Sequence, residues 1–311
     1  NKMVIKEYRL TIRDEKGNPV RIWQNRDERE PGFFARIFIS LGFIKKPELE
    51  VPEVITWDGK DEGGNTVPDG VYTYILEAWD DGGNKAESEP RKIIVDNTPP
   101  MTEVRFDYNI FSPDQDGRKD VLPIRTTASP EDRWKAEVRN KEGKPVAALE
   151  WGNMPPETFY WTGQTEKGEL LPDGEYTLVL SAEDRAGNSF SLITEPIRID
   201  TRSRKFGIGI DYPYFSPNGD GVQDFVILTA SGLETEGLEE AVLEVLDEKG
   251  TVRRSERAVP SLPTAVSFDG KDGSGVLLPD GVYNVRITLT YENGAVVQQE
   301  TEPIVLDTRP A

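Results

Sequence analysis

The chain has 311 residues, of which 36% are hydrophobic and 30% are charged, and its formal net charge is −19. This excess of negative charge repels nucleic-acid phosphates and anionic lipid headgroups, so we expect no nucleic-acid partner and no direct insertion into a membrane. Cys and His are both absent, which excludes disulfides, a thiol nucleophile, a Ser-His-Asp relay and the usual ligand sets of zinc and copper.

The chain opens on a predicted strand and turn, EYRLTIRDEKG, which starts at Glu7. The glycine of this turn lies 40 residues before the next Trp-x-Gly motif. In two later copies of the turn, the distance from the glycine to the Trp-x-Gly or Phe-x-Gly motif is 18 residues. The first copy therefore carries an insertion of 22 residues within roughly positions 21–53. The apolar stretch at 33–44 lies in this insertion, and its 12 residues are too few to span a bilayer.

Periodicity leaves the conformation of this stretch open. Apolar residues occupy every odd position from 33 to 43, as a strand requires, but a helical stripe is also present. An apolar segment in so charged a chain should be covered by something. Either it completes the first domain, or it binds a protein or glycan partner through the residues of the helical stripe. Those residues are Phe33, Phe34, Ile37, Phe38 and Leu41.

Three copies of one unit follow along the chain. Each has a Pro-Asp-Gly turn, an aromatic residue 13 positions before its glycine and an Asp 26 positions after it. After each turn apolar and polar residues alternate, which predicts antiparallel strands with one solvated face. We interpret the tyrosine two residues after each glycine as a corner tyrosine, and the preceding tryptophan as part of the core. These residues are Tyr72, Tyr176, Tyr283, Trp57 and Trp161.

The predicted fold is all-β, with three tandem immunoglobulin-like or fibronectin III-like antiparallel β-sandwiches. We expect domains at residues 1–98, 99–202 and 203–311, and we refer to them as the first, second and third repeats. The first repeat is incomplete, because it has no counterpart of the segment that opens the other two. Two strands of a sandwich are missing from it, which would leave open edges.

That opening segment reads FSPDQDGRKD from Phe111 and FSPNGDGVQD from Phe215. Carboxylates and amides at these spacings, with glycine between them, provide part of a calcium ligand set. They are equally typical of tight turns, and we favour turns. Further ligands would have to come from neighbouring loops at the junction with the next repeat. The candidate calcium ligands are Asp114, Asp116, Asp120, Asn218, Asp220 and Asp224.

The motif Trp-x-Gly, followed by Pro-Asp-Gly-x-Tyr and Ala-x-Asp-x-x-Gly-Asn, resembles the immunoglobulin-like domain of flagellar hook-capping proteins (FlgD Ig-like). It matches at Trp57–Tyr72 and Trp161–Tyr176, and Phe268 replaces the tryptophan in the third copy. The FSPNGDG segment is similar to segments of large surface proteins of gliding bacteria. The resemblance implies an exported module, in the periplasm or at the cell surface of a Gram-negative-type bacterium, with a structural or adhesive role.

We therefore expect a non-enzymatic, rod-like segment of a larger parent protein, with no required cofactor and calcium as the candidate ion. The alternative is a binding module that recognises a protein or glycan through the insertion. A carboxylate-dependent enzyme is a third interpretation, since the chain contains 56 acidic residues.

Overall fold

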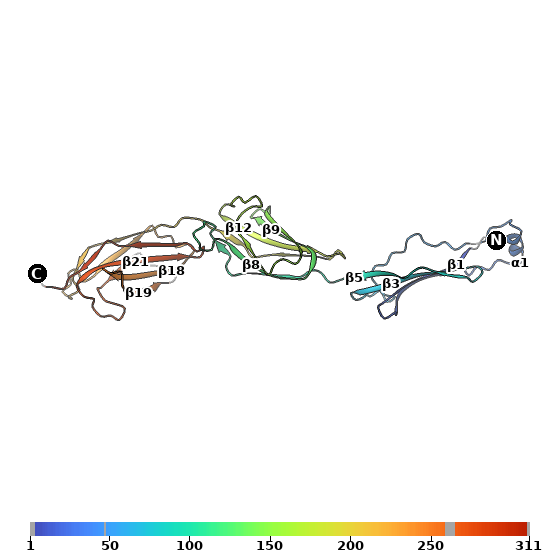
Figure 1. Cartoon of the computed structure of the whole chain (residues 1–311), viewed down its shortest axis with the longest axis horizontal. Helices are drawn as coiled ribbons and strands as arrows, with labels where there is room; N and C mark the ends of the chain where they lie inside the picture. Colours follow the sequence, from blue (N-terminus) through green and yellow to red (C-terminus); the bar gives the residue numbers. More distant parts are fainter. Residues whose placement is uncertain (1–3, 47, 259–264, 310–311) are drawn as a thin grey trace. The chain divides into compact units, whose positions relative to one another are not determined.

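The computed structural model describes residues 4–46, 48–258 and 265–309. These residues form β-strands and one α-helix, which confirms the prediction of an all-β protein (Figure 1). The chain divides into two compact units, Asn1–Pro100 with Glu183–Ser189, and Met101–Ala182 with Phe190–Ala311. The first unit contains the first repeat, and the second unit contains most of the second repeat and all of the third.

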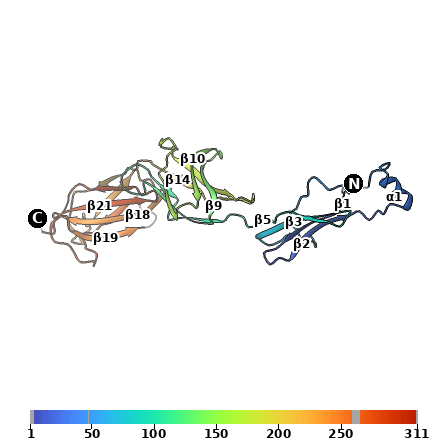
Figure 2. The same ribbon diagram turned by 45° about the vertical axis from the view of Figure 1, so that its right-hand side comes forward.

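The first repeat has one five-stranded antiparallel sheet, in the order β2-β1-β3-β4, with β5 paired to β3 (Figure 2). Its core cluster has three buried residues, Ile12, Val67 and Tyr72. The elements are β1 (Ile5–Arg13), β2 (Pro19–Arg26), α1 (Phe33–Ser40), β3 (Gly70–Asp80), β4 (Lys85–Glu87) and β5 (Arg91–Val95).

The second repeat has two sheets that share one core of 15 buried residues. One sheet has the order β11-β8-β6, and the other has the order β10-β9-β12-β14-β7 with β13 paired to β12. The strands are β6 (Thr102–Phe106), β7 (Ile110–Phe111), β8 (Leu122–Ala128), β9 (Glu131–Asn140), β10 (Pro145–Asn153), β11 (Thr158–Trp161), β12 (Gly174–Glu183), β13 (Ser189–Ile193) and β14 (Ile197–Ile199).

The third repeat is built in the same way around a core of 17 buried residues. Its sheets have the orders β15-β17-β20 and β16-β23-β21-β18-β19, with β22 paired to β21. The strands are β15 (Gly207–Ile210), β16 (Tyr214–Phe215), β17 (Val226–Ser231), β18 (Leu238–Asp247), β19 (Val252–Ala258), β20 (Ala265–Phe268), β21 (Gly281–Tyr291), β22 (Val296–Glu300) and β23 (Ile304–Leu306).

The FSPxxDG segment, which is the ten-residue stretch starting at Phe111 or Phe215, connects the two sheets of its repeat. In the second repeat, β7 pairs in parallel with β14 of one sheet, and after the loop β8 pairs antiparallel with β11 of the other. β16 and β17 do the same in the third repeat. Phe111 and Phe215 are both buried between the sheets. The segment is therefore an integral part of the sandwich.

The Pro-Asp-Gly turns fix the same local geometry three times. The hydroxyl of Tyr72 donates to the carbonyl oxygen of Pro68 at 2.8 Å. Tyr176 and Tyr283 make the same bond, at 2.7 and 2.8 Å, to the proline of their own turn. The prediction of a corner tyrosine is confirmed. Of the two predicted core tryptophans, Trp161 is buried, while Trp57 is only partly buried.

The insertion forms a helix, α1, where periodicity alone had left helix and strand open. A helix satisfies its own backbone groups, whereas a strand would need a neighbour, and none of the described strands pairs with this segment. None of the side chains of α1 is buried. The helix therefore does not cover the sheet of the first repeat. Within the described residues, no helix is both long and apolar enough to cross a membrane.

Candidate functional site

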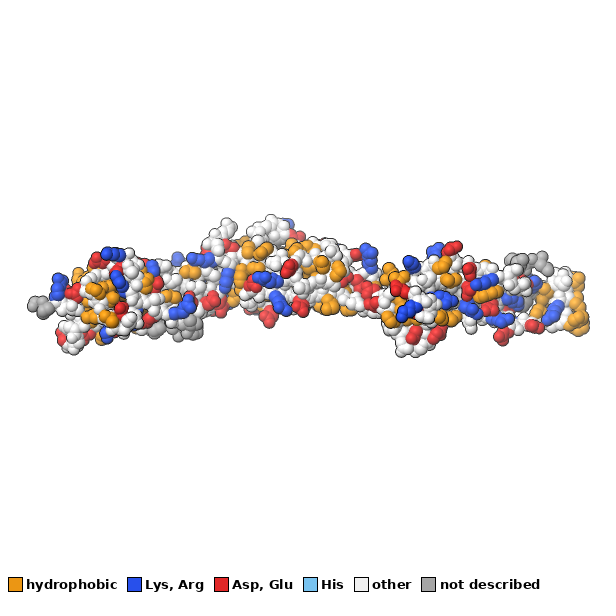
Figure 3. Space-filling model, turned by 60° about the horizontal axis from the view of Figure 1, so that its bottom comes forward, with side chains coloured by type: hydrophobic (Ala, Val, Ile, Leu, Met, Phe, Trp, Pro, Cys, Tyr) orange, Lys and Arg blue, Asp and Glu red, His pale blue; other side chains and the backbone are white. Residues whose placement is uncertain are grey.

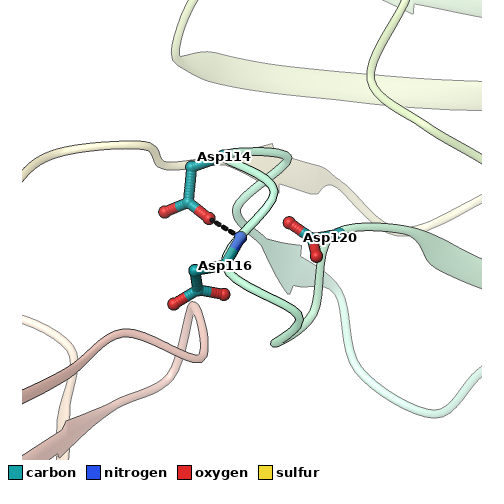
Figure 4. A group of neighbouring side chains, drawn as sticks. All are labelled: Asp114, Asp116 and Asp120. Carbon is teal, nitrogen blue, oxygen red and sulfur yellow. Dashed lines mark hydrogen bonds between the residues drawn. The ribbon is translucent and has the colours of Figure 1, made fainter.

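The loop between β7 and β8 carries the three carboxylates predicted as calcium ligands in the second repeat. One oxygen from each of Asp114, Asp116 and Asp120 lies within 4.8 Å of the others (Figure 4). Asp120 accepts the backbone N–H groups of Gln115 at 2.6 Å and Gly117 at 2.8 Å. The N–H of Asp116 donates to Asp114 at 3.2 Å. Backbone N–H groups of the loop thus donate to the loop's own carboxylates.

The corresponding loop of the third repeat has the same hydrogen bonds. Asp224 accepts the N–H groups of Gly219 at 2.7 Å and Gly221 at 2.9 Å. The N–H of Asp220 donates to the side-chain oxygen of Asn218 at 3.0 Å, and the amide of Asn218 donates back to Asp220 at 3.1 Å. The two loops differ chemically at their first ligand position, where the amide of Asn218 replaces the carboxylate of Asp114.

These hydrogen bonds explain why both loops are rich in Asp and Asn. Their side chains accept the N–H groups that a tight turn leaves without a backbone partner. Gly117 and Gly221 adopt φ values of +86° and +89°, which glycine tolerates. Calcium prefers carboxylate oxygens, and the second-repeat loop offers three carboxylates where the third-repeat loop offers two and an amide. The loop of the second repeat is therefore the stronger candidate for a cation.

The neighbouring loops, which were expected to supply further ligands at this junction, add no carboxylate of the described residues to the group of three. Among the described residues, the cluster that could hold an ion contains only the three loop carboxylates. Asp173 accepts the backbone N–H of Thr201 at 3.0 Å and its hydroxyl at 2.8 Å. Asp200 is bound by two arginines of the linker. Both carboxylates stabilise the linker between the second and third repeats.

The loop itself lies at the junction with the next repeat and packs against the turn between β21 and β22 of the third repeat. The Lys119 ammonium donates to the carbonyl oxygen of Glu292 at 2.7 Å and lies 5.0 Å from the ring centroid of Tyr108. A Cβ added to Gly294 would lie 3.0 Å from the carbonyl oxygen of Arg118. Glycine therefore permits the close approach of the two backbones.

A second set of contacts at this junction involves buried polar groups. Arg204 is 5% exposed, donates to the Asp200 carboxylate at 2.9 Å and also binds the Glu234 carboxylate. Its guanidinium lies 4.9 Å from the ring centroid of Tyr291. Asn293, which is 2% exposed, donates from its side-chain amide to the backbone carbonyl of Asp200 at 2.9 Å. We call these five residues the joint cluster.

The sequence contained a signal for the joint cluster that its motifs did not reveal. Tyr291 and Asn293 lie where the third repeat departs from the Ala-x-Asp-x-x-Gly-Asn pattern of the other two. The departure places a ring and an amide against the linker. Two arginines follow Asp200 within four residues in the linker DTRSR, and only Arg204 is buried.

Ion pairs at the edge of the joint lower the pKa values of two carboxyl groups. Hydrogen bonds from Arg202 and Arg198, at 3.2 and 2.7 Å, lower the pKa of Glu236 to about 2. A hydrogen bond from Arg202 is also the largest cause that lowers the pKa of Asp200. Both groups therefore stay ionised down to acidic pH.

The predicted partner-binding residues lie on and just after α1 and are all exposed. Phe33 and Phe34 are each 74% exposed, and Leu41 is 63% exposed. Hydrophobic side chains gather over α1 on the face shown in Figure 3. Arg36 binds Glu30, and Lys46 binds Asp81. The segment is thus an apolar surface flanked by paired charges.

Each Asp or Glu whose pKa is shifted in the described residues has a lowered pKa, whereas a general acid needs a raised one. A pocket between the sheets of the second repeat is lined mainly by apolar side chains, with Glu166 as its carboxylate. This pocket, with one carboxylate in its lining, does not provide a coupled pair of acids.

Several solved structures are similar to the chain at low identity. A tetra-tandem repeat from the extending region of a large adhesion protein is 19% identical, with 97% of this chain and 67% of that chain covered and a TM-score of 0.29. Fibronectin(III)-like modules of Clostridium thermocellum CbhA are 16% identical, with coverage of 66% and 94% and a TM-score of 0.36. A Ca²⁺-stabilised ice-binding adhesin of an Antarctic bacterium is 10% identical, with coverage of 98% and 66% and a TM-score of 0.36.

No curated protein matches the sequence. Residues 115–186 match the family model of the FlgD Ig-like domain. This range begins inside the candidate calcium loop and extends through the Pro-Asp-Gly turn and the corner tyrosine Tyr176. The resemblance to the FlgD Ig-like domain is confirmed for these residues.

Proposed function

We propose that the chain is a non-enzymatic structural or adhesive segment of a larger exported bacterial protein, located at the cell surface or in the periplasm. The observation that carries this proposal is the joint cluster. Its charged and polar groups, of which Asp200, Arg204 and Asn293 are buried, bind the linker and the neighbouring strand ends, where they fix the orientation of two repeats. Chemistry of this kind suits a spacer that must keep its geometry.

The proposed domains are residues 1–98, 99–202 and 203–311. The linkers between them are short, and DNTPP at Asp96–Pro100 contains two prolines. Proline-rich and short linkers act as semi-rigid spacers. We therefore propose that the repeats are arranged end to end in an extended rod.

Two observations argue against an enzyme. The carboxyl groups with shifted pKa values are all held in the ionised form by hydrogen bonds within turns, strands or the joint, as at Asp184 and Asp247. The acidic residues of the loops bind backbone N–H groups. We propose that the folded chain requires no cofactor, and that calcium, where it binds, occupies the loop with Asp114, Asp116 and Asp120.

Small-angle scattering tests the structural role. An elongated profile, which keeps its maximum dimension as protein concentration falls, supports the rod. Loss of stiffness in a chain with Asn293→Ala and Arg204→Met would connect that dimension to the joint cluster. A compact profile contradicts the proposal, and so does turnover of a glycan or peptide substrate by the purified chain.

The second candidate function is recognition of a protein or glycan partner through α1, and the exposure of its aromatic residues favours it. A chain with Phe33→Ser, Phe34→Ser and Phe38→Ser should keep its melting temperature but lose binding on a glycan array or to a purified surface protein. A matched control replaces Ile193 and Val276 with Ser, which are exposed apolar residues of the other repeats. Equal binding by both variants would exclude α1 as the binding surface.

A further inference from the structure

The second and third repeats show how an FSPxxDG segment is held in its sandwich. Gly163, two residues after the core tryptophan, lies so close to this segment that an added Cβ would be 3.0 Å from Pro113 and 3.4 Å from Phe111. At Gly270 of the third repeat, an added Cβ would meet the same two residue types of its own segment at 3.0 and 3.3 Å. The Phe and Pro of FSPxxDG therefore pack directly against the backbone of this glycine. We call the surface at Gly163 or Gly270 that contacts them the seat.

The first repeat has the same seat, but it is open. Gly59 occupies the corresponding position and has φ of +73°, against +70° and +74° for Gly163 and Gly270. A Cβ added to Gly59 would meet no atom within 4 Å. The backbone of the seat is thus formed in all three repeats, while only two of the seats are filled in the described residues.

The aromatic residue beside the seat shows the same difference. The ring of Phe111 lies 5.4 Å from that of Trp161, and Phe215 lies 5.5 Å from Phe268. Trp161 and Phe268 are 5% and 2% exposed. Trp57 of the first repeat is only partly buried, and within the described residues no ring takes the place of Phe111 beside it.

One edge that such a segment would pair with lies directly before the seat. β11 pairs with β8 so that Trp161 lies opposite Leu122, and β20 pairs with β17 in the same register. The corresponding stretch of the first repeat, VITW at 54–57, pairs with no strand among the described residues. Val54 is 78% exposed. This stretch therefore has an unpaired edge.

The other edge is that of β5. In the second repeat, the backbone N–H of Arg198 in β14 donates to the carbonyl oxygen of Asn109 at 2.8 Å. The backbone N–H of Asp200 donates to the carbonyl oxygen of Phe111 at 3.1 Å. β5 pairs with β3 in the register in which β14 pairs with β12. Its far edge, at Ile94 and Asp96, has no neighbouring strand among the described residues, and Ile94 is 76% exposed.

We propose that the first repeat is an acceptor for a further FSPxxDG-type segment, whose Phe and Pro fill the seat at Gly59 and Trp57. One end of the segment pairs with β5, and its following strand pairs with residues 54–57. Apolar residues of that strand then lie opposite Trp57 and Ile55, as Leu122 and Ile124 lie opposite Trp161 and Phe159. This is strand addition to an open sheet edge.

The occupant is polypeptide other than these 311 residues. Both FSPxxDG segments of the chain are already buried in their own repeats, with Phe111 at 0% and Phe215 at 3% exposure. A second copy could lend a segment only by opening one of its own sandwiches. The helix α1 does not fill the seat either, because none of its residues is buried.

A fusion chain tests the proposal at high effective concentration. A second copy of residues 101–130 is placed directly ahead of Ile5, because β1 and β9 each begin 12 residues before their turn glycine. We expect the melting temperature of the first repeat to rise by about 5 °C or more. Backbone amides at 54–57 and 93–96 should become protected from hydrogen exchange.

The matched control is the same fusion with Phe111→Ala and Pro113→Ala in the added copy, which should lose the protection. Gly59→Ala should lower the melting temperature of the fusion chain more than that of the unfused chain, since it fills the seat. The proposal is overturned if the fusion gives no protection, or if the control fusion protects equally well.

Light scattering of the unfused chain addresses the other occupants. We expect a monomer whose amides at 54–57 exchange rapidly. A concentration-dependent dimer with these amides protected would show that a second copy covers the edge, and would overturn the proposal. Neither result depends on the structural role proposed above, because each concerns the first repeat alone.

Discussion

The side-chain amide of Asn293 donates a 2.9 Å hydrogen bond to the backbone carbonyl oxygen of Asp200, and both residues are buried. A residue of the third repeat thereby holds the end of the last strand of the second. Buried polar groups that lose a partner cost more than exposed ones. The bond is therefore a specific contribution to the stability of the joint.

Replacing Asn293 with Ala should destabilise the joint by about 1–2 kcal/mol, because the carbonyl oxygen of Asp200 loses its partner. Hydrogen exchange of linker residues 201–206 measures this effect. Asn284→Ala is the matched control, since its amide binds the carbonyl of Thr301 at 2.9 Å within the third repeat. If both variants leave the linker equally protected, the bond does not contribute to the joint.

Arg204→Met should cost about 3 kcal/mol, because it removes one partner of a buried ion pair. Arg202→Met, at a side chain that is 40% exposed, should cost no more than about 1 kcal/mol. Calorimetric unfolding of the two variants compares these effects. Equal losses of stability would show that the burial of Arg204 against Tyr291 has no energetic role.

Acidification should weaken the joint. The pKa of Glu236 is lowered to about 2 in the folded chain by hydrogen bonds from Arg202 and Arg198. The unfolded chain therefore binds more protons between this value and the ordinary glutamate range near pH 4.5. The stabilisation is complete above that range and is lost as the pH falls toward 2.

Melting temperature against pH measures this loss, and Glu236→Gln removes the titrating group. The slope between about pH 4.5 and 2 should be smaller in the variant than in the unchanged chain. Glu248→Gln, at an exposed turn residue, is the control for the removal of one carboxylate and should reduce the slope less than Glu236→Gln does. An unchanged slope in Glu236→Gln would contradict the assignment.

Two glycines with equal backbone geometry should differ in their tolerance of alanine. Gly59 and Gly270 have φ of +73° and +74°, so both variants incur the cost of a left-handed conformation, about 1–2 kcal/mol. At Gly270 the new methyl group would also lie 2.9 Å from Leu306, which adds about 1–3 kcal/mol of overpacking. Melting temperatures of the two repeats give the comparison, and equal losses would show that the seat at Gly59 is already filled.

Calcium binding, measured by calorimetric titration, should be confined to the loop of the second repeat and weak, at about millimolar concentration. Asp114→Asn gives this loop the groups of the third-repeat loop and should abolish binding. Asn218→Asp makes the reverse change and should create a second site. Binding that survives Asp114→Asn would place the ion elsewhere, and unfolding by a chelator would contradict a fold that needs no cofactor.

Much of the fold could be predicted because it is encoded locally. The alternation after the third Pro-Asp-Gly turn predicted a strand, and β21 runs from Gly281 to Tyr291. The same alternation predicted strands after the other two turns, where β3 and β12 begin at Gly70 and Gly174.

The remaining features depend on contacts that local patterns do not encode. The apolar pattern of residues 33–43 fits a helix and a strand equally well. The segment forms helix α1 because no strand among the described residues pairs with it. The joint cluster combines Asp200 and Arg204 of the linker with residues 30 or more positions further along the chain. Charge and polarity at these positions are also typical of exposed loops.

We infer that the joint cluster holds the second and third repeats in one orientation. Because the chain has no cysteine, Lys141→Cys and Lys249→Cys give two unique spin-label sites at exposed turns of these repeats. Double electron–electron resonance should give one narrow distance distribution, which broadens when Asn293→Ala and Arg204→Met are added. A broad distribution in the chain without these two changes would show that the joint cluster does not hold the repeats in one orientation.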